Sequence, residues 1–364
     1  MNKILKLFSI ITLTLFGLTL RAQSSDKEAA IELKRKAFDL EDNQGKYDEA
    51  IKLLEAAQKL DPENSTYTYE IAYAYSGKKE HKKSSDILEK ILNKNDAYGR
   101  YFQQLGNEYD YQGLPKKAIE TYEKGIKKFP NYGGLYLERG NMFLPENKYA
   151  EALPYYEKGI ELDPKFASNY YWASKIYCSS TESVWGLIYG EIFINLEQTS
   201  KRTTEISKKL FETYKKNISL ESDTSFGVTF SKNNIINLSD LKDVTKFKLP
   251  FGTGCYEFLM ITAIFGEKSI NLRSLDSIRS RFIKNYFSKD FPQKYPNVLF
   301  DYQKKIKEAG HFDAYNYFIL SGGDTESFQD WIKNNKEKWT NFTVWFSKNE
   351  LKLDDLHRFY RKQY

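Results

Sequence analysis

The sequence predicts an all-α protein, in which a solenoid of about four to five stacked helix pairs precedes a mostly helical domain with a short β or irregular excursion. The first observation behind this prediction is that Gly99–Pro164 contains two consecutive segments with one shared residue pattern. The second is that small residues and prolines recur at one fixed spacing, as is typical of repeat arrays. The third is that apolar residues return at helical spacing after about residue 253, without the repeat.

The length and composition of the chain agree with an array plus a further domain. Its 364 residues exceed what one compact core usually holds, and 41% hydrophobic with 16% aromatic residues argue against disorder. The net charge of +6 comes from basic clusters interleaved with acidic residues, so we expect no nucleic-acid partner. The two cysteines, Cys178 and Cys255, are either buried free thiols or one disulfide bridge.

The amino-terminal residues have the pattern of a secretory signal. Lys3 and Lys6 precede the apolar run 7–20, and a small residue, Ala22, follows it. We therefore predict a signal peptide over residues 1–22 and an exported protein, periplasmic or secreted, with no stable membrane span after cleavage. The alternative is a protein anchored in the membrane by an uncleaved amino-terminal segment.

The repeat has a length of 34 residues, the distance from Pro130 to Pro164. Positions in phase with one another carry matching residues: Pro62, Pro130 and Pro164 in one phase, and Ala50, Ser84, Ala118 and Ala152 in another. These residues resemble the tetratricopeptide repeat, a helix–turn–helix unit with small residues where its helices cross and a proline after the second helix. The resemblance covers residues 29–177, approximately.

Packing chemistry explains the recurring residues. Gly106 and Ala118 let paired helices approach closely, and a proline ends each second helix because it lacks the amide proton. Large rings recur between stacked units at Tyr75, Tyr109, Phe143 and Tyr177. We predict three regions after the signal peptide: the solenoid over 23–198, a connecting helix and linker over 199–240, and a helical domain over 241–364.

The resemblance implies that the first helices line a groove that binds a protein or peptide. Selecting the inward positions by phase gives the candidate binding residues Arg35, Asp39, Tyr69, Tyr73, Arg100, Gln103, Asn107, Tyr111, Asn141, Tyr171 and Lys175. Family members that clamp acidic peptide ends carry paired basic residues and asparagines at such positions. This chain departs from that pattern, with Gln103, Gly134 and Leu137 at the equivalent sites.

The later segments are mostly helical. Residues 183–196 are apolar on nearly all sides, which indicates a buried helix, and 199–216 form an amphipathic helix with a lysine-rich outer face. Residues 225–230 alternate like a short strand. Further helices are expected over 256–265, 274–287, 298–309, 313–320, 325–335 and 337–347.

The sequence lacks the motifs of common catalytic and metal sites. It contains no zinc-protease, phosphate-loop or nucleophile-elbow motif, and Gly252-Thr-Gly254 reads as a loop. His81, His311 and His357 have no metal-ligand spacing. We therefore predict no catalytic residues, metal or cofactor, and a non-enzymatic scaffold for protein–protein interaction. The alternative is an enzyme with its catalytic site in residues 219–364 and repeats that recruit substrate.

Overall fold

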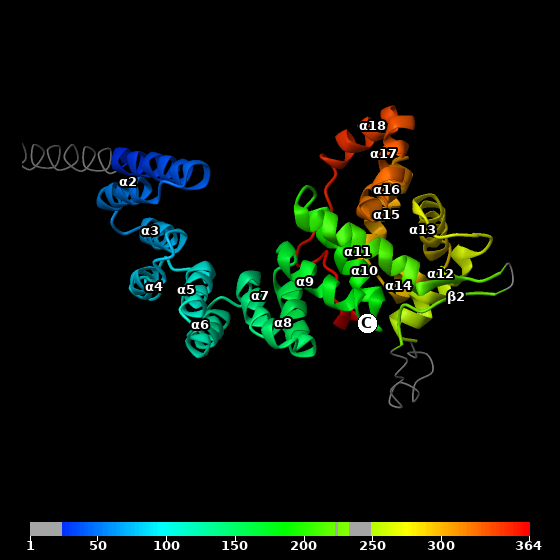
Figure 1. Ribbon diagram of the computed structural model, residues 1–364, viewed down its shortest axis with the longest axis horizontal. Helices are drawn as coiled ribbons and strands as arrows, with labels where there is room; N and C mark the ends of the chain where they lie inside the picture. The colour runs from blue at the N-terminus through cyan, green and yellow to red at the C-terminus, as the bar shows by residue number, and fades with distance from the viewer. Residues whose placement is uncertain (1–23, 223–224, 233–248) are drawn as a thin grey trace, which may run out of the picture. The chain divides into compact units, whose positions relative to one another are not determined.

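The computed structural model describes residues 24–222, 225–232 and 249–364, and the chain divides into two compact units, 1–142 (unit 1) and 143–364 (unit 2). Within the described ranges, the regular structure is helical except for one two-stranded sheet (Figure 1), which confirms the all-α prediction. The predicted signal peptide lies outside the described residues. The predicted boundaries of the solenoid, linker and final domain stay predictions.

Unit 1 is built from helix pairs. Helical residues 24–44 are followed in chain order by α2 (Tyr47–Leu60), α3 (Thr66–Gly77), α4 (His81–Glu89), α5 (Gly99–Tyr111), α6 (Pro115–Lys128) and α7 (Gly133–Asn141). Helices 24–44, α3, α5 and α7 correspond to the first helices of the predicted repeats. Helices α2, α4 and α6 correspond to the second helices.

Small residues at the helix crossings allow close packing, as the sequence predicts. A Cβ atom added to Gly106 of α5 would lie 2.1 Å from Cε1 of Tyr122 on α6. Ala118 is fully buried in the same cluster, which also contains Phe102 and Leu135. The interior of unit 1 therefore depends on the absence of side-chain bulk at these positions.

Prolines stand just after the ends of two of the second helices. Helices α2 and α6 both end two residues before a proline, Pro62 and Pro130. Helix α4 ends earlier, at Glu89, and has 9 residues where α2 and α6 have 14. Asp96 is in phase with the prolines here, and its carboxylate accepts a hydrogen bond of 2.6 Å from the backbone N–H of Ser65, before α3.

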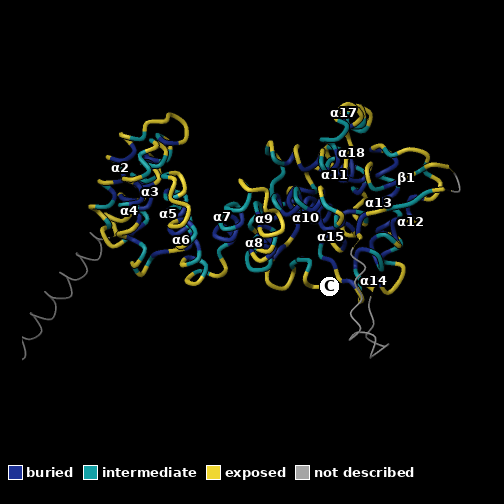
Figure 2. Tube along the Cα trace, turned by 60° about the horizontal axis from the view of Figure 1, so that its bottom comes forward, coloured by how far each residue is buried: buried dark blue, intermediate teal, exposed yellow. Residues whose placement is uncertain are grey.

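The first part of unit 2 continues the array. It contains η1 (Leu144–Glu146), α8 (Tyr149–Leu162), α9 (Ala167–Cys178), α10 (Ser183–Leu196) and α11 (Lys201–Asn217). Helix α10 is buried along nearly its whole length, as its apolar sequence predicts (Figure 2). Gly186 lies so close to α9 that an added Cβ would be 2.4 Å from the backbone nitrogen of Cys178.

The remainder of unit 2 is a helical domain with one hairpin. Its elements are β1 (Ile218–Leu220), β2 (Phe226–Val228), η3 (Gly252–Glu257), α12 (Phe258–Ile264), α13 (Leu272–Phe287), α14 (Phe291–Lys294), α15 (Val298–Glu308), α16 (Phe312–Leu320), η4 (Ser321–Gly323), α17 (Thr325–Asn334), α18 (Lys336–Phe346) and η5 (Arg361–Gln363). Strand β2 confirms the strand predicted over 225–230, and it pairs antiparallel with β1, for which the sequence made no prediction.

The loop assignment of Gly252-Thr-Gly254 was wrong, because these residues belong to the π-helical turn η3. Both glycines are needed for packing in this turn. A Cβ on Gly252 would lie 2.5 Å from Ser231, and one on Gly254 would lie 2.4 Å from Leu249. Glycine is the residue that permits such close approach, so the same residues that suggest a loop here allow a wide helical turn.

The carboxyl-terminal segment packs back onto the array helices of unit 2. Arg361 forms two hydrogen bonds with the carboxylate of Glu157 on α8, at 2.8 and 2.9 Å. The ring of Tyr364 stacks on Phe251, with 4.6 Å between the ring centroids. Arg361 and Tyr364 therefore anchor the carboxyl-terminal segment on unit 2, while Lys362 and Gln363 between them are exposed.

Candidate functional site

The first helices of unit 1 gather carboxylates and tyrosine rings on one face, which we call the first-helix face. Its members are Glu41, Asp42, Glu70, Tyr73, Asp110, Tyr111 and Glu138. The pKa of Tyr73 is raised by burial and then by the charges of Asp42, Glu41 and Glu70, which shows that these groups are neighbours. In the same way, burial and then Glu138 raise the pKa of Tyr111, with smaller effects from Glu108, Asp110 and Tyr73.

Two predicted binding residues, Tyr73 and Tyr111, present exposed rings. Their exposed fractions are 46% and 61%, which is high for large side chains in the body of an array. The ring of Tyr111 lies 4.9 Å from that of His81, centroid to centroid. Exposed rings on successive first helices supply contact area with little side-chain entropy to lose on binding.

Three other predicted residues, Gln103, Asn107 and Asn141, converge on Glu138. The side-chain amides of Gln103 and Asn141 donate to its carboxylate at 2.9 and 3.0 Å. Burial raises the pKa of Glu138, whereas hydrogen bonds from all three amides oppose that rise. Asn107 also accepts a hydrogen bond of 2.7 Å from the hydroxyl of Tyr122. These amides hold Glu138 in place, so the acidic group is the centre of the cluster.

The sequence analysis did not select Glu138, although its position in the repeat pattern pointed to it. Glu138 is in phase with Gln104 and Glu70 in the preceding repeats, one position after the inward sites that we selected. In the structure, Glu70 accepts a hydrogen bond of 3.2 Å from Arg100. Burial raises the pKa of Glu70, and Arg100 and Lys34 oppose this effect.

Tyr69 and Arg100 have mainly structural contacts. Tyr69 is 8% exposed and stacks on Tyr101 with 4.8 Å between centroids. The guanidinium of Arg100 lies 4.3 Å from the centroid of the Tyr69 ring while it pairs with Glu70. Arg100 is the only arginine of α3 and α5, and its charge neutralises Glu70, one carboxylate of the first-helix face.

Glu41 is the second residue that the sequence did not single out. It is 6% exposed, and among the described residues no hydrogen-bond donor reaches its Oε1 atom. Burial raises its pKa to about 7, with further contributions from the charges of Glu70 and Asp42. Glu41 is in phase with the ring positions Tyr75 and Tyr109, so a carboxylate occupies a place where later repeats carry an aromatic ring.

Arg35 and Asp39 form only local contacts. Arg35 donates two hydrogen bonds to Glu32, at 2.7 and 2.9 Å, and Asp39 accepts from Asn43 at 2.7 Å. Arg35, Asp39 and Asn43 are exposed, and Glu32 is half-buried. No contact joins Arg35 or Asp39 to the tyrosines of the first-helix face in the part of the chain that the structure describes.

The last two predicted binding residues, Tyr171 and Lys175, are engaged within unit 2. The hydroxyl of Tyr171 donates to Glu205 of α11 at 2.6 Å, and Lys175 pairs with the same carboxylate at 2.7 Å. Tyr171 is only 7% exposed. Helix α11 therefore covers α9 at the positions where the repeat pattern predicts a binding surface.

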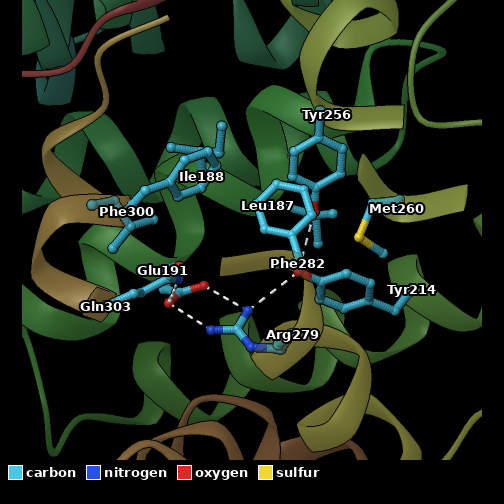
Figure 3. A pocket seen from close by; sticks show the side chains of 11 residues that line it. Leu187, Ile188, Glu191, Tyr214, Tyr256, Met260, Arg279, Phe282, Phe300 and Gln303 are labelled. Atoms are coloured by element: carbon cyan, nitrogen blue, oxygen red, sulfur yellow. Dashed lines mark hydrogen bonds and ion pairs between the residues drawn. The ribbon is translucent and has the colours of Figure 1, made fainter. Parts of the chain in front are cut away.

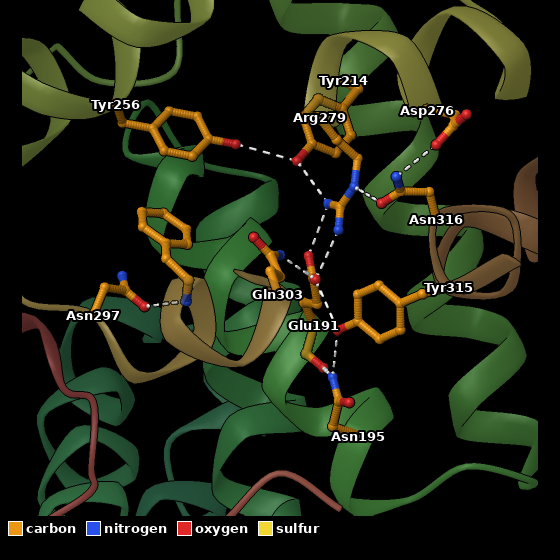
Figure 4. A network of polar contacts seen from close by, with 11 residues as sticks. Glu191, Asn195, Tyr214, Tyr256, Asp276, Arg279, Asn297, Gln303, Tyr315 and Asn316 are labelled. Atoms are coloured by element: carbon orange, nitrogen blue, oxygen red, sulfur yellow. Dashed lines mark hydrogen bonds and ion pairs between the residues drawn. The ribbon is translucent and has the colours of Figure 1, made fainter. Parts of the chain in front are cut away.

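Unit 2 contains a buried polar network centred on Glu191 of α10 and Arg279 of α13 (Figure 4). Two guanidinium nitrogens of Arg279 donate to the two carboxylate oxygens, at 2.7 and 2.8 Å. Gln303 and Tyr315 also donate to Glu191, and Asn316 accepts from Arg279 at 2.6 Å. Both charges are compensated, and the pair is almost completely buried.

A small cavity adjoins this network (Figure 3). Its volume is about 20 Å³, which suits one water molecule, whereas sites for small-molecule ligands usually measure about 300–1,000 Å³. Apolar side chains such as Leu187, Met260 and Phe282 form much of its wall. Across residues 24–222, 225–232 and 249–364, no group of three or more His, Cys, Asp or Glu residues is placed to hold a metal ion.

A larger surface groove of about 790 Å³ lies in unit 2. Its lining residues are Lys165, Leu196, Lys305, Ser347, Lys348, Asn349, Glu350, Leu351, Lys352, Leu353 and Asp354. Asp354 is engaged by the backbone N–H groups of Leu356 and His357. Lysines outnumber carboxylates in this lining, but their side chains extend into solvent at several positions.

None of the helices that the structure describes combines the length and the apolar character that crossing a membrane requires.

Comparison with known proteins identifies the repeats. Two family models described as tetratricopeptide repeat match residues 43–105 and 104–165. No curated protein matches the chain.

Solved structures give weak likenesses. A thermophilic tetratricopeptide repeat protein of Thermus thermophilus is 16% identical, with 50% of this chain and 99% of that chain covered and a TM-score of 0.42. The pilF protein of Pseudomonas aeruginosa is 18% identical over 52% and 86%, also with a TM-score of 0.42. A tetratricopeptide repeat protein from Parabacteroides merdae is 13% identical over 81% and 99%, with a TM-score of 0.37. The family models and the helix pairs together show that residues 43–165 of this chain are tetratricopeptide repeats.

Proposed function

We propose that the protein is an exported, non-enzymatic scaffold whose first-helix face binds a segment of a partner protein. Tetratricopeptide repeats generally mediate protein or peptide binding, and the matched repeats include most of this face. The observation that supports the site most directly is the pair of exposed rings, Tyr73 and Tyr111, on successive first helices. The charge of Tyr73 contributes to the raised pKa of Tyr111, as do the nearby carboxylates, which supports a shared surface for the two rings.

The positions of the other predicted residues narrow the binding surface to unit 1. Tyr171 and Lys175 are occupied by contacts with α11, so they contribute to the fold of unit 2. Gln103, Asn107 and Asn141 remain beside the exposed rings, where they orient Glu138. A partner would therefore meet tyrosine rings and a positioned carboxylate.

Site-specific crosslinking tests this surface. A photoreactive amino acid is placed at Tyr111 of the full chain in the native cell, and the control carries it at Glu120, an exposed position on the second helix α6. We expect crosslinks to a partner segment from position 111, and the loss of this partner when Tyr73→Ala is added. Equal crosslinking from both positions, or none from position 111, would contradict the assignment.

Export is proposed from the amino-terminal pattern, in which Lys3 and Lys6 precede the apolar run 7–20. Fractionation of the native cell with mass measurement of the chain tests it. We expect the protein outside the cytoplasm, shortened by the residues up to Ala22. A full-length chain in the cytoplasmic fraction would contradict export, and a full-length chain in the membrane fraction would favour the uncleaved anchor.

The alternative of an enzyme has its nearest candidate in the network of Glu191 and Arg279. These two groups neutralise each other, and the adjoining cavity has room for one water molecule. The geometry of the network therefore supports a structural role, and it does not favour the enzymatic alternative over a scaffold.

A further inference from the structure

We propose that the first-helix face recognises a cationic segment, a stretch of partner chain that carries lysine or arginine side chains. This inference rests on the proposed function and specifies the chemistry of the partner. It follows from the charge of the face, from a buried carboxylate oxygen that lacks a donor, and from the position of the two exposed rings.

The first-helix face is acidic in a chain that is basic overall. Five carboxylates lie on it, those of Glu41, Asp42, Glu70, Asp110 and Glu138. The opposing charges that act on this cluster come from Arg100, which pairs with Glu70, and from Lys34. The net charge of the whole chain is +6, so the acidity of the face is a local feature. An acidic surface attracts cationic partners and repels anionic ones.

Glu41 provides the observation that points to a ligand. Its side chain is nine-tenths buried, and its Oε1 atom has no donor among the described residues. The groups that face it are Asp42 on its own helix and Glu70 and Tyr73 on α3, and the two carboxylates disfavour its ionised form. A buried carboxylate without a donor costs stability, and an ammonium or guanidinium group would supply both the missing hydrogen bond and the missing charge.

Glu138 offers a second, preorganised carboxylate. Three neutral amides donate to it, from Gln103, Asn107 and Asn141, and no basic side chain among the described residues forms an ion pair with it. The Gln103 amide is fixed in turn, because its oxygen accepts a hydrogen bond of 2.8 Å from the hydroxyl of Tyr132. Amide donors orient a carboxylate but leave its negative charge in place. Glu138 therefore remains available to a cation from the partner.

The two exposed tyrosines complete the chemistry. Tyr73 lies beside Glu41 and Glu70, and Tyr111 lies beside Glu138. A ring next to a carboxylate suits lysine and arginine, because the ring contacts the aliphatic stem or the cationic face while the carboxylate binds the charged end. The same combination is unfavourable for an acidic peptide, which would bring like charges together.

The test uses the full chain and two labelled peptides that differ only in charge. One peptide alternates lysine with serine, and the other has glutamate in place of each lysine. Fluorescence anisotropy is measured over a series of salt concentrations. We expect binding of the lysine peptide, weaker as salt increases, and no binding of the glutamate peptide.

Matched variants locate the binding on the first-helix face. The double variant Glu41→Gln/Glu138→Gln should bind the lysine peptide with about tenfold lower affinity, because two ion pairs of moderate strength are lost. The control variant Glu55→Gln/Glu120→Gln removes the same charge from exposed sites on α2 and α6, and its affinity should be unchanged. Circular dichroism confirms that both variants are folded.

Three outcomes would overturn the proposal: tight binding of the glutamate peptide, an equal loss of affinity in both double variants, or no binding of either peptide. The crosslinking at position 111 separates this result from the proposed function. If position 111 captures partner segments that lack basic residues, the scaffold function holds and the cationic inference fails. If position 111 captures nothing, the surface assignment itself fails.

Discussion

Arg361, three positions before the end of the sequence, donates two hydrogen bonds to Glu157 on α8. Glu157 is 4% exposed and also accepts a hydrogen bond of 2.9 Å from the hydroxyl of Tyr177. The backbone N–H of Arg361 donates to the hydroxyl of Tyr189 at 2.9 Å. This relationship ties the carboxyl terminus to the array helices of unit 2.

The variant Arg361→Met should destabilise unit 2 by about 2 kcal/mol, because it leaves the buried carboxylate of Glu157 with neutral partners only. We expect less than the full cost of breaking a buried pair, since the Arg361 side chain is 38% exposed and water screens it. Tryptophan fluorescence during urea unfolding measures the effect, because all five tryptophans belong to residues 143–364. The conservative variant Arg361→Lys should recover part of the loss, and a full loss in Arg361→Lys would argue against the ion pair.

The variant Glu191→Gln should destabilise unit 2 more strongly, by about 3–5 kcal/mol, because Arg279 would remain charged and buried without its counter-ion. Both side chains of this pair are about 5% exposed, so solvent offers little compensation. Replacing both residues together, as Glu191→Leu/Arg279→Met, should cost less than the single change. A single variant as stable as the parent in urea unfolding would contradict the central role of this pair.

The stability of unit 1 should fall as pH rises from about 4.5 to about 7. The folded-state pKa of Glu41 is raised from 4.5 to about 7, by burial first and then by Glu70 and Asp42. In this window the unfolded chain releases its proton while the folded chain retains it, so the free energy of unfolding decreases with pH. The contribution of Glu41 is at most about 3 kcal/mol, and it is fully lost above pH 7.

Glu41→Gln should remove most of this dependence and stabilise unit 1 at pH 8. The pKa values of Glu70 and Glu138 are also raised, so the free energy of unfolding should still decrease with pH, but less steeply. Far-UV circular dichroism detects the helices of unit 1, and Glu55→Gln on the exposed side of α2 is the matched control. If the free energy of unfolding of Glu41→Gln depends on pH as that of the parent does, the Glu41 carboxylate is not buried as described.

Gly106→Ala should destabilise unit 1 by about 1–3 kcal/mol. Alanine is favoured over glycine in a helix by about 1 kcal/mol, but here the added methyl group would overlap the ring of Tyr122. The overlap should outweigh the gain in propensity because Tyr122 is 2% exposed and cannot move freely. Thermal unfolding followed by circular dichroism measures the difference, and Tyr122→Leu in the same chain should relieve the overlap. A more stable Gly106→Ala would contradict the close crossing.

Cys178 and Cys255 should resist thiol reagents in the native protein and react on unfolding of unit 2. Both are buried and neither is in a disulfide, and burial raises the pKa of the Cys178 thiol, which lowers its thiolate fraction. A disulfide between them, which the sequence left open, would yield no reactive thiols after unfolding without reductant. Counting the thiols before and after denaturation distinguishes these cases.

Much of the fold could be predicted because its signals are local. The predicted helix over 183–196 coincides with α10, and the helix predicted over 298–309 agrees with α15 to one residue. Apolar periodicity, capping residues and prolines act on neighbouring turns, so a single sequence reveals them. The turn η3 was missed because two glycines close in sequence are compatible with a loop and with a wide helical turn. Packing against Ser231 and Leu249 decides between these two structures.

The sequence by itself determined that this protein is a tetratricopeptide repeat array followed by further helices, and it placed Tyr73 and Tyr111 among the candidate binding residues. Only the tertiary structure decided which charged groups meet. It placed Glu138 among three amides, left Glu41 buried without a donor, covered Tyr171 with α11, and joined Arg279 to Glu191 across 88 residues. The physical reason is that the packing of successive helix pairs depends on small and apolar residues that recur at a fixed spacing, which can be read from the sequence. Charge compensation depends on burial and on side chains brought together from distant helices.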